Sequence, residues 1–250
     1  MSAALETVGV SRSFGGILAT NDVTLAIERG ARHALIGPNG AGKTTFVNLL
    51  TGMLRVDSGR ILLEGEDITQ LKPHERARRG IARTFQINQL FGDLTPLETI
   101  GLAVSERLGA GSDWWRLPGT RREITDEIVE ILDRFRLASV MHERTATLPY
   151  GRQRLLEIAL ACACRPRVLL LDEPAAGVPT SESAEIFDTL AALPEDVSVL
   201  LIEHDMDLVF RFARRITVLV DGTLFADGPA DDIARDPRVK AAYLGEALNA

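Results

Sequence analysis

Apolar residues along this 250-residue chain follow two different patterns. Short, nearly continuous apolar runs predict strands at residues 31–36, 167–171 and 197–202, and the last two are expected to be buried on both faces. Apolar residues that recur every three or four positions predict helices at residues 44–53, 152–164, 181–193 and 206–213. Because strands alternate with helices, the sequence predicts an α/β protein with a mainly parallel sheet and helices on both of its faces.

Weaker signals add further elements around this core. Strands are expected at residues 5–14, 23–27 and 60–64. The dipeptide Asp221-Gly222 separates two apolar runs and predicts a β-hairpin. Residues 73–80 predict a short basic helix, and its arginine residues belong to a cluster formed by Arg76, Arg78, Arg79 and Arg83. We interpret this cluster as a solvated helix face, with docking to a partner as the alternative.

The middle of the chain has a different character. Between residues 95 and 147 the strand-like runs stop, and apolar residues recur at helical spacing at Ile124, Ile128, Ile131, Leu132 and Phe135. We therefore expect a mostly helical subdomain at residues 95–149, inserted into an α/β core that comprises residues 1–94 and 150–250.

Composition excludes several classes of protein. The formal net charge of −7 argues against a nucleic-acid-binding protein, which would carry a basic face. No apolar run approaches the ~18 residues of a membrane-spanning helix. The first residues lack the basic and apolar segments of a secretory signal. The two cysteines, Cys162 and Cys164, predict neither a disulfide nor a metal site.

One stretch fits the pattern G-x-x-x-x-G-K-[ST] at every fixed position. It consists of Gly37, Pro38, Asn39, Gly40, Ala41, Gly42, Lys43 and Thr44. A predicted strand precedes it and a predicted helix follows, which is the context of a phosphate-binding loop. Glycines let the backbone approach a triphosphate closely, and the helix directs its first N–H groups at the anion. Lys43 is then expected to reach the β- and γ-phosphates, and the Thr44 hydroxyl to bind Mg²⁺.

Two later strands are predicted to bring further chemistry to the same edge of the sheet. The first ends in Asp172 and Glu173. Ligands of open α/β sheets bind at the carboxyl ends of strands, so Asp172 is expected to hold Mg²⁺ through its water shell and Glu173 to polarise the attacking water. The second ends before His204, whose expected role is to contact the γ-phosphate or orient the water. For His33 we expect a structural or solvated position.

The order of these motifs resembles the ATP-binding subunit of an ABC transporter over essentially the whole chain. The resemblance implies a P-loop NTPase cassette with an antiparallel β subdomain and an inserted helical subdomain. It also implies that Phe14 stacks on adenine, that Thr45 belongs to the nucleotide site, and that Gln86 contacts Mg²⁺ and signals to membrane subunits. ATP and Mg²⁺ are the implied ligands. Residues 148–154 occupy the place of the family's LSGGQ signature, in which Gly151 survives.

Within that family the chain resembles the uptake systems for branched-chain and other hydrophobic amino acids. The segments that carry this resemblance are residues 14–16, 79–86, 172–177, 202–206 and 242–246. The implied function is ATP hydrolysis for an importer at the cytoplasmic face of the inner membrane. The implied partners are a second ATPase subunit, two integral permease subunits and, indirectly, a periplasmic solute-binding protein. The alternatives are a lipopolysaccharide-export ATPase and a soluble ABC ATPase outside transport.

The signature departs from the family pattern at three positions. Pro149 replaces the serine, Tyr150 the first of the paired glycines and Arg152 the final glutamine. Proline has neither a hydroxyl nor an N–H group to offer a phosphate. We therefore expect the composite site formed by this signature to hydrolyse ATP poorly, which would suit a heterodimer whose partner supplies an intact signature.

Overall fold

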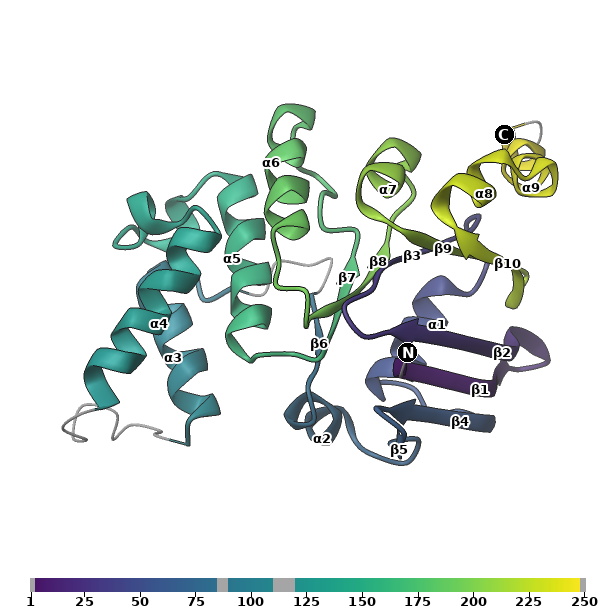
Figure 1. Ribbon diagram of the computed structural model, residues 1–250, viewed down its shortest axis with the longest axis horizontal. Helices are drawn as coiled ribbons and strands as arrows, with labels where there is room; N and C mark the ends of the chain where they lie inside the picture. Colours follow the sequence, from purple (N-terminus) through teal and green to yellow (C-terminus); the bar gives the residue numbers. More distant parts are fainter. Residues whose placement is uncertain (1–2, 85–89, 110–119, 248–250) are drawn as a thin grey trace. The chain divides into compact units, whose positions relative to one another are not determined.

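The computed structural model describes residues 3–84, 90–109 and 120–247 (Figure 1). The chain forms two compact units, and each is described separately. We call the first, made of residues 1–83, 167–173 and 194–250, the core unit. The second, made of residues 84–166 and 174–193, is the helical unit. The subdomain predicted at residues 95–149 lies within the residue range of the helical unit. The predicted division of the chain into an ATP-binding core and an inserted helical subdomain stays a prediction.

The core unit contains an antiparallel sheet with the strand order β2-β1-β4-β5. Its strands are β1 (Ala3–Phe14), β2 (Ile17–Glu28), β4 (Ser58–Leu63) and β5 (Glu66–Asp67). β1 and β2 form one long hairpin that turns at Gly15-Gly16, where both glycines have a positive φ. The strands expected at residues 5–14 and 23–27 are therefore longer than their apolar patterns indicated, because the alternation weakens near the exposed turn.

A second sheet of the core unit has the strand order β10-β9-β3-β8-β7-β6. Its strands are β3 (Arg32–Ile36), β6 (Ile81–Arg83), β7 (Val168–Asp172), β8 (Ser198–Ile202), β9 (Arg215–Val220) and β10 (Thr223–Pro229). All neighbours are parallel except the β9–β10 hairpin. Every residue of β3, β7 and β8 is buried, which fits strands covered on both faces. The predicted mainly parallel sheet and hairpin are confirmed.

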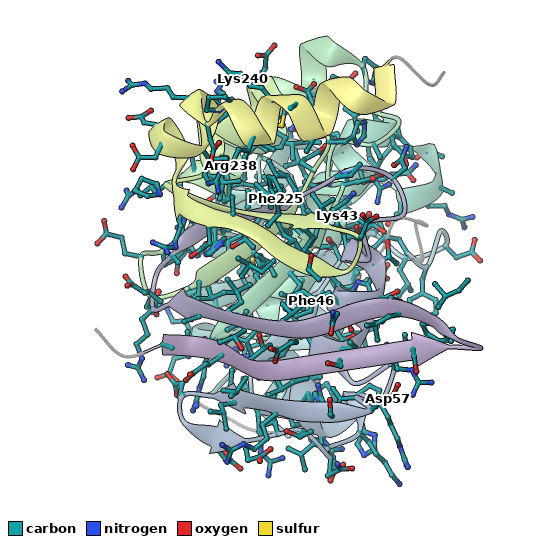
Figure 2. All side chains as sticks on the ribbon, turned by 90° about the vertical axis from the view of Figure 1, so that its right-hand side faces the viewer. Lys43, Phe46, Asp57, Phe225, Arg238 and Lys240 are labelled. Atoms are coloured by element: carbon teal, nitrogen blue, oxygen red, sulfur yellow. The ribbon has the colours of Figure 1, made fainter. Side chains whose placement is uncertain are left out.

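Helix α1 (Lys43–Thr51) contributes to the main apolar core of this unit. Phe46 (Figure 2), Val47, Leu49 and Leu50 are fully buried and cluster with side chains from both sheets. The remaining helices of the core unit are α2 (Pro73–Arg78), α7 (Met206–Phe212), α8 (Ala230–Arg235) and α9 (Pro237–Ala247). The packing of α1 fixes the helix whose first turn follows the glycine-rich loop.

Arg76 on α2 corrects the interpretation of the arginine cluster as a solvated face. Its side chain is fully buried and donates hydrogen bonds to the carbonyl oxygens of Leu49 (2.6 Å), Leu50 (2.8 Å) and Thr69 (2.7 Å). The first two carbonyls belong to the last turn of α1, where the helix itself supplies no donors. Burial lowers the pKa of Arg76 to about 10. Arg76, on helix α2, thus caps the C-terminal end of α1 by donating hydrogen bonds to its last carbonyl groups.

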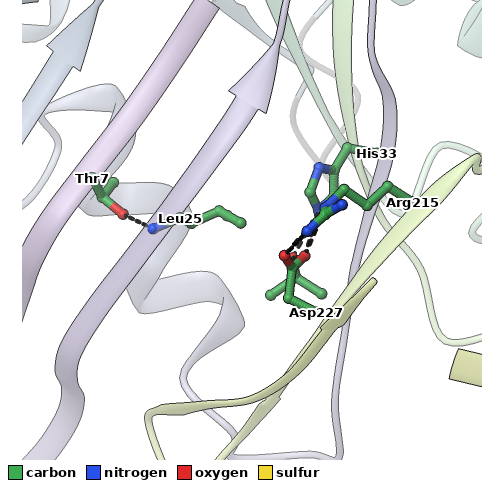
Figure 3. A network of polar contacts seen from close by, with 6 residues as sticks. Thr7, Leu25, His33, Arg215 and Asp227 are labelled. Carbon is green, nitrogen blue, oxygen red and sulfur yellow. Dashed lines mark hydrogen bonds and ion pairs between the residues drawn. The ribbon is translucent and has the colours of Figure 1, made fainter. Parts of the chain in front are cut away.

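A polar network connects β3, β9 and β10 of the second sheet (Figure 3). His33 on β3 is completely buried, and its Nε2 lies 2.7 Å from the Thr217 hydroxyl of β9. Thr217 also contacts the carboxylate of Asp227 on β10 at 2.7 Å, and Arg215 forms an ion pair with the same carboxylate. Burial lowers the pKa of His33 to about 4. Of the structural and solvated positions expected for this histidine, the structure shows the structural one.

The helical unit consists of α3 (Pro96–Arg107), α4 (Thr120–Arg134), α5 (Tyr150–Ala163) and α6 (Thr180–Ala191), with short 3₁₀ turns at Ala138–Val140 and Thr145–Thr147. The apolar residues singled out between Ile124 and Phe135 are all buried, and α4 packs against α3 and α5 (Figure 1). The predicted helical character is confirmed. Within the described ranges, no helix is both long and apolar enough to cross a membrane.

Candidate functional site

The glycine-rich loop connects β3 to α1 and leaves no room for side chains at two of its glycines. A Cβ atom at Gly37 would overlap the carbonyl oxygen of Leu219, and one at Gly42 would overlap that of Ala19. Gly42 also has φ 92°, a left-handed conformation that favours glycine. Backbone carbonyl groups of other segments therefore pack directly against Gly37 and Gly42, and only glycine leaves room for these contacts.

Lys43 folds back over this loop. Its ammonium donates hydrogen bonds to the carbonyl oxygens of Pro38 (2.9 Å) and Gly37. α1 begins at Lys43 without a side-chain cap on its first N–H groups. Asn39, Gly40 and Thr44 are exposed, Thr45 is half-buried and Ala41 is buried. A fixed cation and an uncapped helix start thus share one loop, which is a favourable arrangement for a phosphate group.

Strand order brings the predicted acidic residues close to the loop. β8 lies between β3 and β7, and all three run parallel. Asp172 is the last residue of β7 and is buried, with 4% of its surface exposed. Its Oδ2 accepts a hydrogen bond from Arg83 at 2.7 Å, and Arg83 also donates to Asn48 of α1 at 2.6 Å. The interpretation of Arg83 as part of a solvated helix face is therefore wrong.

Glu173 follows Asp172 in a left-handed conformation with φ 48°. Its N–H group donates to the Ile202 carbonyl of β8 at 2.9 Å, so the backbone at the ends of both strands stays linked. The Glu173 carboxylate is 29% exposed, and its Oε1 lies 3.6 Å from Nδ1 of His204, which is 71% exposed. The structure therefore brings these two predicted residues together, both accessible to solvent.

Glu203 is a component of this site to which the sequence argument gave no role. It is buried, and its Oε2 accepts hydrogen bonds from the N–H groups of His204 (3.0 Å) and Asp205 (3.4 Å). The same oxygen lies 3.6 Å from Nδ1 of His204. Burial raises the pKa of Glu203, whereas these two N–H groups oppose the shift. A carboxylate at the end of an otherwise apolar strand is the sequence signal that could have drawn attention to it.

Phe14 ends β1 beside the hairpin turn, with 43% of its surface exposed. The Arg12 guanidinium lies 5.0 Å from its ring centroid, and Arg12 also forms an ion pair with Asp57 at 2.6 Å. The exposure of Phe14 leaves ring surface accessible, as a stacking role requires. Gln86, the remaining predicted residue of the core site, lies outside the described residues.

The segment with the altered signature begins α5 in the helical unit. Pro149 is the N-cap residue and provides no side-chain cap. Gly151 is buried, and a Cβ atom there would overlap the Glu182 carboxylate. Arg152 donates to Glu185 at 2.9 Å and to the Arg136 carbonyl at 3.0 Å. The first turn of α5 therefore already has a carboxylate of its own chain against it.

These observations define a protein with a glycine-rich loop of the phosphate-binding type and with acidic residues at the carboxyl ends of two parallel strands, β7 and β8. The family profile described as "ABC transporter" matches residues 20–176, which is more than half of the 250-residue chain. The chain thus belongs to the ABC transporter family and is one of its ATP-binding ATPase cassettes. A second profile, "Branched-chain amino acid ATP-binding cassette transporter", matches residues 223–248.

Curated relatives and solved structures agree with this assignment. The chain is 41% identical to the "High-affinity branched-chain amino acid transport ATP-binding protein BraF" of Pseudomonas aeruginosa, with 97% of this chain and 98% of the relative covered. It is 40% identical to the corresponding protein LivG of Escherichia coli, with 99% and 100% covered. The ADP conformation of an ATP-binding cassette of an ABC transporter matches with a TM-score of 0.83 at 30% identity, covering 98% of this chain and 99% of that one. The predicted family and fold class are confirmed.

The residues present fit a bound Mg²⁺ ion together with ATP. A hydroxyl from Thr44 and a buried carboxylate from Asp172 are oxygen donors of the type that Mg²⁺ accepts alongside phosphate oxygens. Both come from elements of the core unit, one from the start of α1 and the other from the end of β7. The nucleotide phosphates would supply the remaining charge.

Proposed function

We propose that the chain hydrolyses ATP to power an importer of branched-chain or related amino acids and small organic acids. The observation that carries the hydrolytic part is that Glu173 and His204 lie 3.6 Å apart, just after the ends of β7 and β8, in the same sheet as the strand β3 that precedes the phosphate loop. The names of the relatives in Pseudomonas aeruginosa and Escherichia coli support the solute class. The match at residues 223–248 favours this function over lipopolysaccharide export or a soluble role outside transport.

Each site residue has a defined task in this proposal. Residues 37–45 hold the phosphates through their backbone and through Lys43, and Phe14 stacks on the adenine. Thr44, Asp172 and Gln86 would hold Mg²⁺, which when bound would neutralise charge on the phosphate oxygens.

The chemical step then depends on two residues at the strand ends. Glu173 accepts the proton of the attacking water, and its partly exposed side chain is accessible for this purpose. His204 donates a hydrogen bond toward the γ-phosphate or orients the same water. Glu203 supports the backbone of His204 by accepting its N–H group. Catalysis would be mainly positioning and charge stabilisation, as in other phosphoryl transfers.

The proposed assembly contains a second ATPase subunit and two integral permease subunits at the cytoplasmic face of the inner membrane. A periplasmic solute-binding protein would deliver the solute. Gly151 would face the γ-phosphate bound to the partner ATPase subunit. Three observations support a weak signature here: Pro149 lacks an N–H group, Glu182 lies against Gly151, and Arg152 is paired with Glu185. The intact phosphate loop of this chain would therefore work best with the signature of a different partner.

ATP hydrolysis tests the function and the asymmetry together. The purified chain is assayed alone and with its candidate partner subunit, each with and without Glu173→Gln. Activity that requires the partner and is lost mainly with Glu173→Gln, rather than with the equivalent change in the partner, supports the heterodimer. Equal losses from both subunits would remove the asymmetry. Uptake of radiolabelled leucine by proteoliposomes that contain the permease subunits tests the solute class, and hydrolysis without uptake would contradict it.

A further inference from the structure

Arg83 connects two elements of the core unit that both carry residues of the proposed Mg²⁺ site. One arm of its guanidinium donates to Oδ2 of Asp172 at 2.7 Å, at the end of β7. The other donates to Oδ1 of Asn48 at 2.6 Å, on α1. Asn48 follows Thr44 by four residues, so the two side chains lie on the same face of that helix. Arg83 therefore spans the distance between the helix of one proposed ligand and the strand of the other.

The surroundings of this contact distinguish it from an ordinary surface ion pair. The side chain of Arg83 is 11% exposed and that of Asp172 is 5% exposed, so solvent screens the pair only weakly. A charge-assisted hydrogen bond in such a place holds a carboxylate in one orientation. Replacing a residue that hydrogen-bonds to a metal ligand commonly lowers the metal affinity about tenfold to a hundredfold.

We propose that Arg83 is a positioning residue for the metal-binding carboxylate of Asp172, an inference that rests on the proposed ATPase function. The hydrogen bond from Arg83 to Oδ2 fixes the orientation of the carboxylate plane and leaves Oδ1 for the hydrated ion. The hydrogen bond from Arg83 to Asn48 fixes the position of this carboxylate relative to α1 and Thr44. A lysine cannot do both, because a single ammonium lacks the planar fork that reaches two separate acceptors.

Nucleotide binding with and without metal tests this role. ATP affinity is measured by calorimetry in Mg²⁺ and again in excess chelator, for the wild type and for Arg83→Gln, Arg83→Lys and Asn48→Ala. The quantity compared is the ratio of the ATP affinity in Mg²⁺ to the ATP affinity in chelator. We expect Arg83→Gln and Arg83→Lys to reduce this ratio about tenfold or more, and Asn48→Ala to reduce it less. Binding without metal should change less than about twofold. Arg79→Gln is the control, because Arg79 pairs with the exposed Glu66 and should leave both affinities unchanged.

A second measurement reports on the ion itself. Mn²⁺ replaces Mg²⁺, and its electron paramagnetic resonance spectrum with bound nucleotide should broaden or change in Arg83→Gln but not in Arg79→Gln. If Arg83→Gln does not fold, as judged by circular dichroism, Arg83→Lys and Asn48→Ala decide the question by the same affinity ratio.

Two outcomes would overturn the proposal. Unchanged strengthening by Mg²⁺ in all Arg83 variants would leave Arg83 with a structural role only. Increased strengthening would mean that Arg83 competes with the ion for Asp172 and must leave before it binds. Failure of the Mg²⁺-dependent ATP binding that the proposed function requires gives a different result, because the wild type would then show no tighter ATP binding in Mg²⁺ than in chelator.

Discussion

His204 and Glu173 lie 3.6 Å apart, measured from Nδ1 to Oε1, although 30 intervening residues separate them along the chain. The register of the sheet produces this proximity, since Asp172 on β7 is paired with Ile202 on β8. The separation is longer than a good hydrogen bond. Catalytic contacts of this kind commonly shorten only when substrate is bound, so the pair is compatible with a water or phosphate oxygen as a shared partner.

Replacing Glu173 with glutamine should abolish most hydrolysis and preserve nucleotide binding. The variant keeps the size of the side chain and loses the group that accepts the proton. We expect a roughly 10²–10³-fold slower single-turnover rate, in the range of general-base contributions, with ATP affinity within about twofold of the wild type. Glu195→Gln, at an exposed position, is the matched control. A normal rate in Glu173→Gln would mean that another group accepts the proton of the attacking water.

Replacing His204 with alanine should affect the rate without affecting stability. The side chain is 71% exposed, so its loss should change the free energy of unfolding by less than about 0.5 kcal/mol. Hydrolysis should fall roughly 10²-fold, because one charge-stabilising contact is lost. Thermal unfolding and single-turnover kinetics measure the two effects. His142→Ala, at another exposed histidine, should change neither. A large loss of stability in His204→Ala would indicate a structural role instead.

Replacing Arg76 with leucine should destabilise the core unit. The variant leaves buried carbonyl groups at the end of α1 without their donor, and each unpaired group costs about 1–3 kcal/mol. We expect a total loss of about 3 kcal/mol in the free energy of unfolding, measured by urea denaturation. The control is Arg78→Leu, because Arg78 is exposed on the same helix and its replacement should change stability by less than about 0.5 kcal/mol. Equal effects of both changes would contradict the capping role.

The parts of the site that the sequence predicted are those that need neighbouring residues of fixed type. The phosphate loop requires glycines and a lysine within one short stretch, and Asp172 and Glu173 are adjacent at the end of an apolar run. The sheet then brings such strand ends to one edge. Local pattern therefore sufficed for the loop and for the placement of the acidic residues.

Contacts between distant segments were not predictable in this way. Arg83 pairs with Asp172 across 89 positions, and Arg76 reaches Leu49 across 27. In the sequence both arginines belong to a basic cluster, which is typical of a solvated face. Their burial depends on acceptors that tertiary packing supplies: a carboxylate at a strand end in one case and the last carbonyls of α1 in the other. Side-chain periodicity contains no information about such acceptors.

Stability should depend on the protonation of His33 in mildly acidic solution. Its native pKa is about 4, below the ordinary value of 6.5, because the ring is buried. The unfolded chain therefore binds a proton that the native chain excludes, so the stability contributed by neutral His33 is complete above pH 6.5 and is lost as the pH falls toward 4. The difference corresponds to about 3 kcal/mol. The free energy of unfolding is measured by urea titration at several values between pH 4.5 and 7.5. His33→Asn should lose the fall in this free energy with decreasing pH, whereas His142→Ala should retain it. If wild type and His33→Asn show the same dependence on pH, the buried network does not exclude the proton from His33.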